Sequence, residues 1–289
     1  MMNTQHLPRY FRNSFSSVRV SGALFTLFVY TIMPTKLDAA TPSIVAHRGA
    51  SHAAPENTLP SVLLAWKERA DATEVDIHLT KDNQVIVLHD KTTGRTAGTD
   101  MKVADTNYED LKPLDVGTWK SEKYQGTRIP LLKDILAHIP TGKRIFIEIK
   151  CPSTVLPHLE KVVRNSGLSA EQTVFIAFDW DTIRLTKERF PDCSCFWLSG
   201  FKQNKETRKW EPEPEEVLQR AIDAKVDGVD VHHGGPVDRR FVESAKSKGL
   251  EVHVYTVNDP ADAKRMLEAG VNGITTDRPA FMKKTLELD

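Results

Sequence analysis

The chain has 289 residues, and its 39 Lys and Arg residues balance 39 Asp and Glu residues, so the formal net charge is zero. With 27% charged and 40% hydrophobic residues, the composition is that of a folded globular protein and excludes a disordered or fibrous one. Because basic residues are not in excess, the composition argues against a nucleic-acid partner. Three cysteines are too few for a disulfide framework.

The first forty residues have the features of a secretory signal peptide. Three arginines precede the apolar run 23–33, and Ala39 and Ala40 are small residues of the kind at which such signals are cleaved. The run is short for a membrane span, although an uncleaved anchor is the alternative. We therefore expect a signal peptide at 1–40 and a secreted or periplasmic chain at 41–289, with no stable membrane span after cleavage. Removing four basic groups and one acid leaves 35 basic against 38 acidic groups, a slightly acidic chain.

After the signal, short apolar runs alternate with segments of helical spacing. The predicted strands are Ser43–Ala46, Thr73–Leu79, Gln84–Leu88, Arg144–Ile149, Thr173–Ala177, Ser194–Leu198, Gly228–Val231, Glu251–Val257 and Gly273–Thr276. The predicted helices are Thr58–Arg69, Leu131–Ile139, Val155–Asn165, Trp180–Arg189, Pro214–Ala224, Val237–Lys248, Pro260–Ala269 and Ala280–Leu286. Residues 90–128 form a polar, irregular insertion, and residues 201–216 are expected to be a solvated loop.

This alternation predicts an α/β fold of parallel strands. The third strand is expected to be the second arm of a hairpin turned at Asn83, which leaves eight parallel strands. Eight βα units in about 250 residues are the size of a TIM (β/α)8 barrel. The alternative, a doubly wound open sheet, lacks support because the chain has no GxGxxG and no GxxxxGK[ST] motif.

Active sites of such barrels lie at the carboxyl ends of the strands. The first predicted strand ends at His47 and Arg48, and the hairpin arm ends at His89. Side chains alternate along a strand, so two polar pairs are expected to face the barrel axis while their apolar neighbours face the helices. The two pairs are Glu74 with Asp76 and Glu148 with Lys150.

These residue types point to phosphoryl chemistry. Three converging carboxylates need a compensating charge, and oxygen-only ligands suit one hard divalent cation, Ca²⁺ or Mg²⁺. His47 and His89 beside that cation could act as general acid and base. Arg48 and Lys150 would bind a phosphate group. Together they describe phosphoryl transfer to a hydroxyl group or water.

Several ordered motifs resemble the glycerophosphodiester phosphodiesterase family, in its bacterial, secreted type. These motifs are HRGASHAAPENT (47–58), EVDIHLTKD (74–82), LHDKTTGRT (88–96), IPLLKDIL (129–136), IEIK (147–150), YTVN (255–258) and GVNGITTDRP (270–279). They span about residues 43–284 in the family's order. The resemblance implies a TIM barrel that hydrolyses small-molecule glycerophosphodiesters to an alcohol and sn-glycerol 3-phosphate.

The resemblance also implies roles for individual residues. His47 and His89 correspond to the catalytic acid/base pair, and Glu74, Asp76 and Glu148 to the metal ligands. Arg48 and Lys150 match phosphate contacts, and Glu56 is expected to orient the residues that end the first strand. Tyr255 stands where the family usually has tryptophan, which leaves the substrate preference open. The insertion at 90–128 corresponds to a segment that caps the barrel mouth.

Two other functions remain alternatives. One is a phospholipase of the phosphatidylinositol-specific or sphingomyelinase D type, which acts on intact lipid and usually exposes an apolar rim. The other is a non-catalytic barrel protein that only binds its ligand, although such a protein is expected to have lost a histidine or a metal carboxylate. His232 and His233 end a predicted strand, where contact with substrate and a place in a surface loop are equally compatible with the sequence.

Overall fold

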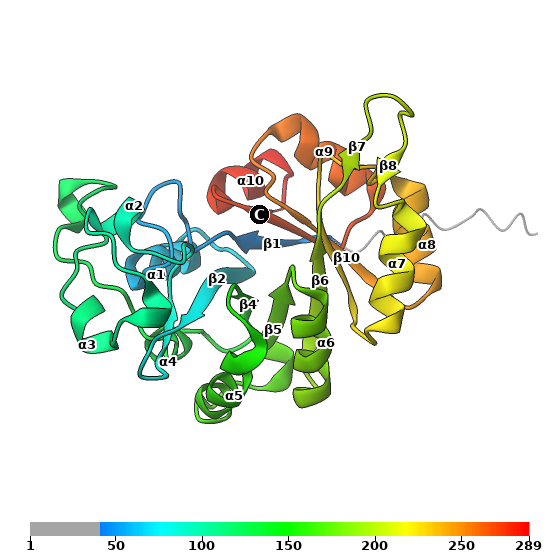
Figure 1. Ribbon diagram of the computed structural model, residues 1–289. Helices are drawn as coiled ribbons and strands as arrows, with labels where there is room; N and C mark the ends of the chain where they lie inside the picture. The colour runs from blue at the N-terminus through cyan, green and yellow to red at the C-terminus, as the bar shows by residue number, and fades with distance from the viewer. Residues whose placement is uncertain (1–40, 289) are drawn as a thin grey trace, which may run out of the picture. The chain divides into compact units, whose positions relative to one another are not determined.

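The computed structural model describes residues 41–288, whose strands close into a ring of eight (Figure 1). All neighbours in the ring are parallel, and β1 pairs with both β2 and β11, which closes it. The strands of the ring, in chain order, are β1 (Ser43–Ala46), β2 (Ala72–Leu79), β4 (Arg144–Ile149), β5 (Thr173–Ala177), β6 (Ser194–Ser199), β9 (Gly228–His232), β10 (Glu251–Tyr255) and β11 (Gly273–Thr276). The predicted TIM barrel is confirmed.

Eight helices connect these strands or follow the last of them. They are α1 (Leu59–Lys67), α4 (Leu132–Leu136), α5 (Leu156–Arg164), α6 (Trp180–Arg189), α7 (Pro214–Asp223), α8 (Arg239–Ser247), α9 (Pro260–Ala269) and α10 (Pro279–Thr285). Side chains that cap helix amino termini begin several of them: Thr58 accepts from the backbone of Ser61, and Asp259 accepts from Ala261. The predicted helix at 131–139 is correct in position but ends at Leu136, three residues early.

A hairpin and an irregular segment interrupt the alternation after β2. β3 (Val85–Val87) lies antiparallel on β2, and the turn between them passes through Asn83 at a φ of 61°, as predicted. The insertion then contains α2 (Gly94–Ala97), η1 (Val103–Asp105), α3 (Tyr108–Leu111) and η2 (Glu122–Tyr124). It has its own small core of Ile86, Leu88, Val103, Leu111, Val116 and Ile129. Two further short 3-10 turns, η3 (Ser153–Val155) and η4 (Ala170–Gln172), precede α5 and β5.

The buried apolar residues form an outer layer between strands and helices and a smaller set inside the ring. The inner set is Val45, Ala72, Phe146, Val174, Ile176, Phe196 and Leu198. His253 lies among them, with its ring stacked on Phe196 at a centroid distance of 4.5 Å. Gly273 is needed beside this ring, because a Cβ at that position would overlap His253 Nδ1. The interior of the barrel is therefore filled with side chains at the level of His253 and Phe196.

The segment 201–216 is more ordered than the solvated loop that we predicted. It contains a two-stranded antiparallel ribbon of β7 (Lys202–Gln203) and β8 (Trp210–Glu211). Trp210 meets Phe201 edge to face at 6.5 Å, and Phe201 in turn meets Phe241 of α8 at 6.1 Å. These ring contacts connect the ribbon to α8.

The predicted signal peptide lies outside the described residues. Within residues 41–288, no helix has the length and apolar character required to cross a membrane. The three cysteines in this range are all free thiols.

Candidate active site

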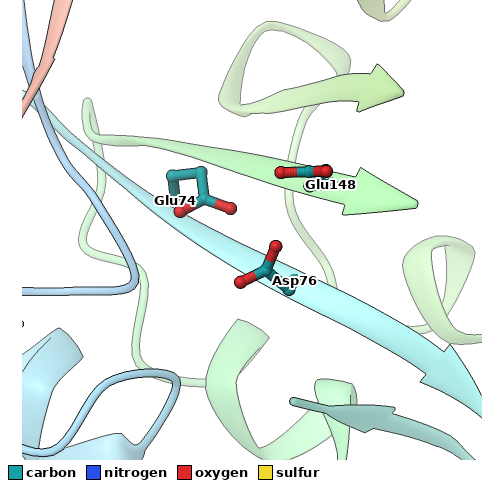
Figure 2. Close-up of side chains that lie close together, drawn as sticks. All are labelled: Glu74, Asp76 and Glu148. Carbon is teal, nitrogen blue, oxygen red and sulfur yellow. The ribbon is translucent and has the colours of Figure 1, made fainter. Parts of the chain in front are cut away.

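Three carboxylates meet inside the ring on neighbouring strands β2 and β4, with Glu148 near the carboxyl end of β4 (Figure 2). Glu74 and Asp76 both point inward from β2, and the β4 register sets Glu148 directly beside Asp76. Their side chains offer oxygens that all lie within 4.8 Å of one another. Glu74 is 2% exposed and Asp76 is fully buried. The strand periodicity thus brings together three groups that were selected from the sequence.

Two oxygens of this cluster accept no hydrogen bond from the part of the chain that the structure describes. Oε1 of Glu74 and Oδ1 of Asp76 are buried without a hydrogen-bond partner among the described residues. Burial and then the charge of Asp76 raise the pKa of Glu74 well above its usual value, and the same two causes raise the pKa of Glu148 to about 7. Because hard divalent cations take carboxylate oxygens as ligands, Glu74, Asp76 and Glu148 could hold such an ion.

Arg48 and Lys150 lie against the same carboxylates. Arg48 Nε is 3.2 Å from Asp76 Oδ2, while Lys150 Nζ is 2.9 Å from Glu148 Oε1 and 3.6 Å from Asp76 Oδ1. Burial would by itself raise the pKa of Asp76. The positive charges of Arg48 and Lys150 have a larger opposite effect, so the pKa of Asp76 is lowered. Arg48 has a left-handed φ of 54°, and its backbone N–H donates to Glu74 Oε2 at 2.8 Å. The strained backbone therefore directs an amide toward the carboxylates.

Asn57 holds Asp76 in place, which the sequence reasoning missed. Its Nδ2 donates to Asp76 Oδ2 at 2.7 Å, and its Oδ1 accepts from the backbone N–H of Asp76 at 3.0 Å. Asn57 has a left-handed φ of 58°, which asparagine tolerates better than most residues. Asn57 is part of the PENT motif in the sequence. Its contact with Asp76, however, depends on how the first βα loop folds over β2.

A carboxylate from the far end of the chain orients His47. Nδ1 of His47 is 2.7 Å from Oδ1 of Asp277, and since a carboxylate only accepts, Nδ1 carries the proton. Asp277 is in turn fixed by Asn258, whose Nδ2 donates to its Oδ2 at 2.6 Å, and by the hydroxyl of Ser51 at 3.0 Å. Burial would raise the pKa of Asp277, but these bonds and the His47 ring lower it to about 2. Asp277 and Asn258 were not selected from the sequence, although both lie in motifs quoted for the resemblance.

The second histidine has the same type of partner. Nδ1 of His89 is 2.7 Å from Oδ1 of Asp90, so its Nε2 is the remaining nitrogen for chemistry. Burial lowers the pKa of His89, and this effect exceeds the opposing charge of Asp76. His78 lies behind it, with Nε2 3.1 Å from the His89 carbonyl oxygen. Both candidate catalytic histidines thus have a carboxylate on Nδ1.

Glu56 and Arg95 connect the first loop to the insertion. Oε1 of Glu56 accepts from Arg48 Nη1 at 2.9 Å and from Arg95 Nη2 at 2.7 Å. Arg95 also donates from Nε to Asp90 Oδ2 at 2.6 Å. Glu56 therefore contacts Arg48 at the end of the first strand, and Arg95 is an additional residue that links Glu56 to the partner of His89.

The insertion also binds the first βα loop directly. Lys120 Nζ donates to the Ser51 carbonyl at 2.7 Å, and the Tyr124 hydroxyl donates to the Ala53 carbonyl at 2.9 Å. These two bonds fasten the insertion over the loop that carries the first-strand site residues.

Aromatic residues form the wall supplied by the later strands. The Tyr255 hydroxyl donates to the Ser199 carbonyl at 3.2 Å, and its ring meets Phe178 and His232 edge to face, each at 5.8 Å. The His232 ring stacks on that of His233 at 4.8 Å. His232 thus lies beside Tyr255 at the end of β9, while His233 is 3.5 Å from Asp262 on α9.

A hollow of about 470 Å³ adjoins the carboxylates between the ends of β4 and β5. Glu148, Lys150, Lys91 and Phe178 contribute to its lining. Two larger hollows, of about 550 and 510 Å³, are lined mainly from α5, α6 and α4 and by none of the site residues. Of these three hollows, only the one of about 470 Å³ has candidate site residues, Glu148 and Lys150, in its lining.

Known proteins share both this sequence pattern and this fold. The pattern of the glycerophosphoryl diester phosphodiesterase family matches residues 47–281. A Bacillus subtilis glycerophosphodiester phosphodiesterase is 30% identical over 256 residues, which cover 83% of this chain and 85% of the relative. The human lysophospholipase D GDPD1 is 34% identical over 92% of this chain and 95% of its own length. A phosphodiesterase of Oleispira antarctica, solved in complex with the product sn-glycerol-3-phosphate, has the same fold with a TM-score of 0.76 at 24% identity, covering 86% of this chain and 97% of that one.

Proposed function

The chain belongs to the glycerophosphoryl diester phosphodiesterase family, and on that premise we propose that it hydrolyses glycerophosphodiesters to an alcohol and sn-glycerol 3-phosphate. One observation carries the proposal further than family membership. Two histidines, each with a carboxylate on Nδ1, accompany a cluster of three carboxylates and two cationic side chains at one barrel mouth. This set includes a residue for each role that acid/base catalysis on a phosphodiester requires: an acid, a base, ligands for a cation and positive charges for the phosphate.

We propose that Glu74, Asp76 and Glu148 hold one divalent cation, Ca²⁺ or Mg²⁺. The buried oxygens of Glu74 and Asp76 that accept no hydrogen bond within residues 41–288 support this, because a bound cation would compensate their charge. When bound, such an ion would neutralise negative charge on the phosphate and make phosphorus easier to attack.

The histidines are proposed to move the protons. With Nδ1 protonated and bonded to Asp277 or Asp90, each ring presents Nε2 to the site. One Nε2 would take the proton of the glycerol 2-hydroxyl as its oxygen attacks phosphorus. The other histidine would have to carry a proton on Nε2 as well as on Nδ1, and it would donate this Nε2 proton to the leaving oxygen as the bond from that oxygen to phosphorus breaks. Water would then open the cyclic phosphate with the two roles reversed.

Direct attack by water is the alternative to the cyclic route. The two routes differ in whether a cyclic glycerol phosphate forms. Single-turnover reactions of a slow variant, quenched and analysed by ³¹P NMR, should contain this intermediate, and its absence would favour direct hydrolysis.

Arg48 and Lys150 are proposed to bind the phosphate oxygens. Both already lie against the carboxylates, so their positive charges are held at the place where the phosphate would arrive. A guanidinium group can donate two parallel bonds to a phosphate, whereas the Lys150 ammonium acts as a point charge.

The test is release of sn-glycerol 3-phosphate from glycerophosphocholine by the purified protein. We expect EDTA to abolish the release and Ca²⁺ or Mg²⁺ to restore it. His47→Ala and His89→Ala should each lose about 10²–10⁴-fold in kcat, the usual worth of general acid/base catalysis. Losses of less than about tenfold would reject the histidine assignment.

Lysophospholipid hydrolysis is the second candidate, because one relative is named a lysophospholipase D. Large exposed apolar side chains near the mouth include Phe178 on the wall and Trp119 on the insertion. Lysophosphatidylcholine presented below its micellar concentration, next to glycerophosphocholine at equal concentration, separates the two substrate classes through the ratio of kcat/KM.

We further propose that the enzyme acts outside the cytoplasm. The support is the arginine-flanked apolar run followed by Ala39 and Ala40 in the sequence. Mass spectrometry of protein recovered from the periplasm or the medium should give an amino terminus close to these alanines. An intact amino terminus on a cytosolic protein would contradict this location.

A further inference from the structure

A fourth carboxyl group faces the interior of the barrel from the side opposite β2. Asp230 lies on β9, which is four strands from β2 in either direction around the ring. Its neighbours Val229 and Val231 pack in the outer layer, so the alternation of side chains turns Asp230 inward. It is 1% exposed, and on β6 and β10 it stands beside Leu198 and His253.

This carboxyl group has an unsatisfied hydrogen-bonding atom. Oδ1 of Asp230 is buried and has no partner within residues 41–288. Burial first, and the charge of Glu148 second, raise the pKa of Asp230 to about 8. The charge of Asp230 also helps raise the pKa of Tyr255, so the carboxyl group is within electrostatic reach of both the carboxylate cluster and the aromatic wall.

Nothing in the packing accounts for an acid at this position. The two residues beside it in the sheet register are Leu198 and His253, and a leucine or valine in place of Asp230 would avoid burying a polar atom without a partner. Residues that reduce stability without a structural benefit are typical of binding sites, where the missing partner is the ligand.

We propose that Asp230 binds a hydroxyl group of the polyol part of the substrate and thereby selects diesters of glycerol. A hydroxyl both donates and accepts, so it can pair with the O–H or the carbonyl oxygen of a neutral carboxyl group. A phosphate oxygen only accepts, so it could pair with the O–H of this group but not with its carbonyl oxygen, and an alkyl group would leave Oδ1 without a partner. This inference rests on the proposed function, because it assigns a binding residue to the glycerol part of the same substrate.

The position of Asp230 suits this role. The carboxylate cluster and both histidine systems lie on the β1, β2 and β4 side of the mouth, whereas Asp230 approaches from β9. A phosphate held at Arg48 and Lys150 would leave its glycerol carbons free to extend across the interior toward Asp230. The larger leaving alcohol would then occupy the hollow beside Lys150 and Phe178.

The experiment compares two ligands with the same phosphate group. sn-Glycerol 3-phosphate carries two hydroxyls and propyl phosphate carries none, and both are titrated calorimetrically into the protein with Ca²⁺ or Mg²⁺ present. Wild type should bind sn-glycerol 3-phosphate at least tenfold more tightly than propyl phosphate. Asp230→Val should reduce that preference at least fivefold while its affinity for propyl phosphate changes less than twofold. Asp230→Asn, which retains a donor and an acceptor, should keep most of the preference.

Two controls make the outcome decisive. Leu198→Val alters an apolar neighbour in the same layer and should affect both ligands equally. The thermal midpoint of Asp230→Val should equal or exceed that of wild type, which establishes that the variant folds. An unchanged preference in Asp230→Val, with wild type still hydrolysing glycerophosphocholine, overturns the inference and leaves the proposed function standing. Failure of wild type to hydrolyse any glycerophosphodiester overturns both.

Discussion

Asp277 accepts a hydrogen bond from Nδ1 of His47 at 2.7 Å, although 230 residues separate the two in the chain. The closure of the barrel between β1 and β11 is what makes them neighbours. The bond fixes which ring nitrogen carries the proton, so the chemistry proposed for His47 depends on a residue near the end of the chain.

Asp277→Asn tests this dependence. The amide that replaces the carboxylate would have the same shape, but its NH₂ group can donate to Nδ1 and so favour the wrong tautomer of His47. We expect kcat for glycerophosphocholine to fall by roughly 10²-fold or more, with little change in KM. Ser51→Ala, which removes only the hydroxyl bond to the same carboxylate, should cost no more than about fivefold. Equal effects of the two variants would contradict the tautomer argument.

Asn57→Gly should reduce stability and cation affinity together. Glycine accepts the left-handed backbone of this position, so the variant removes the two bonds to Asp76 without adding strain. Loss of a partner from a buried charged group should lower the free energy of unfolding by about 1–3 kcal/mol, measured by urea denaturation in EDTA. Cation affinity should fall by about 10–100-fold, the usual effect of removing a group that orients a ligand. Unchanged affinity would show that Asp76 is held adequately by Arg48.

Cation binding should release protons near neutral pH. Burial and the charge of Asp76 raise the pKa values of Glu74 and Glu148 in the cation-free protein, that of Glu148 to about 7, so protons must leave before the carboxylates can bind an ion. Affinity for Ca²⁺ or Mg²⁺ should therefore weaken as the pH falls below about 7. Calorimetric titrations in two buffers of different ionisation enthalpy measure the number of protons released. Glu148→Gln should release fewer protons, and identical heats in both buffers for wild type would refute the prediction.

Arg95→Lys should slow the reaction without removing a group from the site. Lysine keeps the positive charge but cannot bond to Glu56 and Asp90 at once with the fixed geometry of a guanidinium group. Loosening of Asp90 and of Glu56 should lower kcat by about tenfold, equivalent to roughly 1.4 kcal/mol. Arg128→Lys is the matched control, because Arg128 lies in the same insertion and donates to the Pro113 carbonyl. A control that matches the Arg95 effect would indicate general loosening of the insertion.

The sequence predicted what depends on short-range periodicity. Alternation along β2 and β4 correctly indicated that Glu74, Asp76 and Glu148 face the inside of the ring, where Lys150 also lies, bonded to Glu148. The number and order of the parallel strands followed from the repeated change between strand and helix spacing. The ribbon at 202–211 was missed because two-residue strands leave no measurable alternation.

The missed site residues share a different property. Asp277, Asn57 and Arg95 act through partners on other elements, and Asp230 is distinguished by an oxygen that has no partner in the described part of the chain. Such relationships are created by barrel closure and loop folding, which spacing along one segment does not encode. A polar residue at an inward position of another strand is the sequence feature that could have identified such a residue. Applying the alternation of side chains to β9 would have identified Asp230.

The stacked ring of His253 on Phe196, with Gly273 making room for it, gives the barrel a solid base. A ligand of the carboxylates would therefore have to reach them from the carboxyl ends of the strands. Under the proposed function, the substrate would enter and both products would leave at that end, next to the insertion that is bonded to the first βα loop. A phosphate product that stays bound there would prevent the next diester from binding. We therefore expect sn-glycerol 3-phosphate to be a competitive inhibitor.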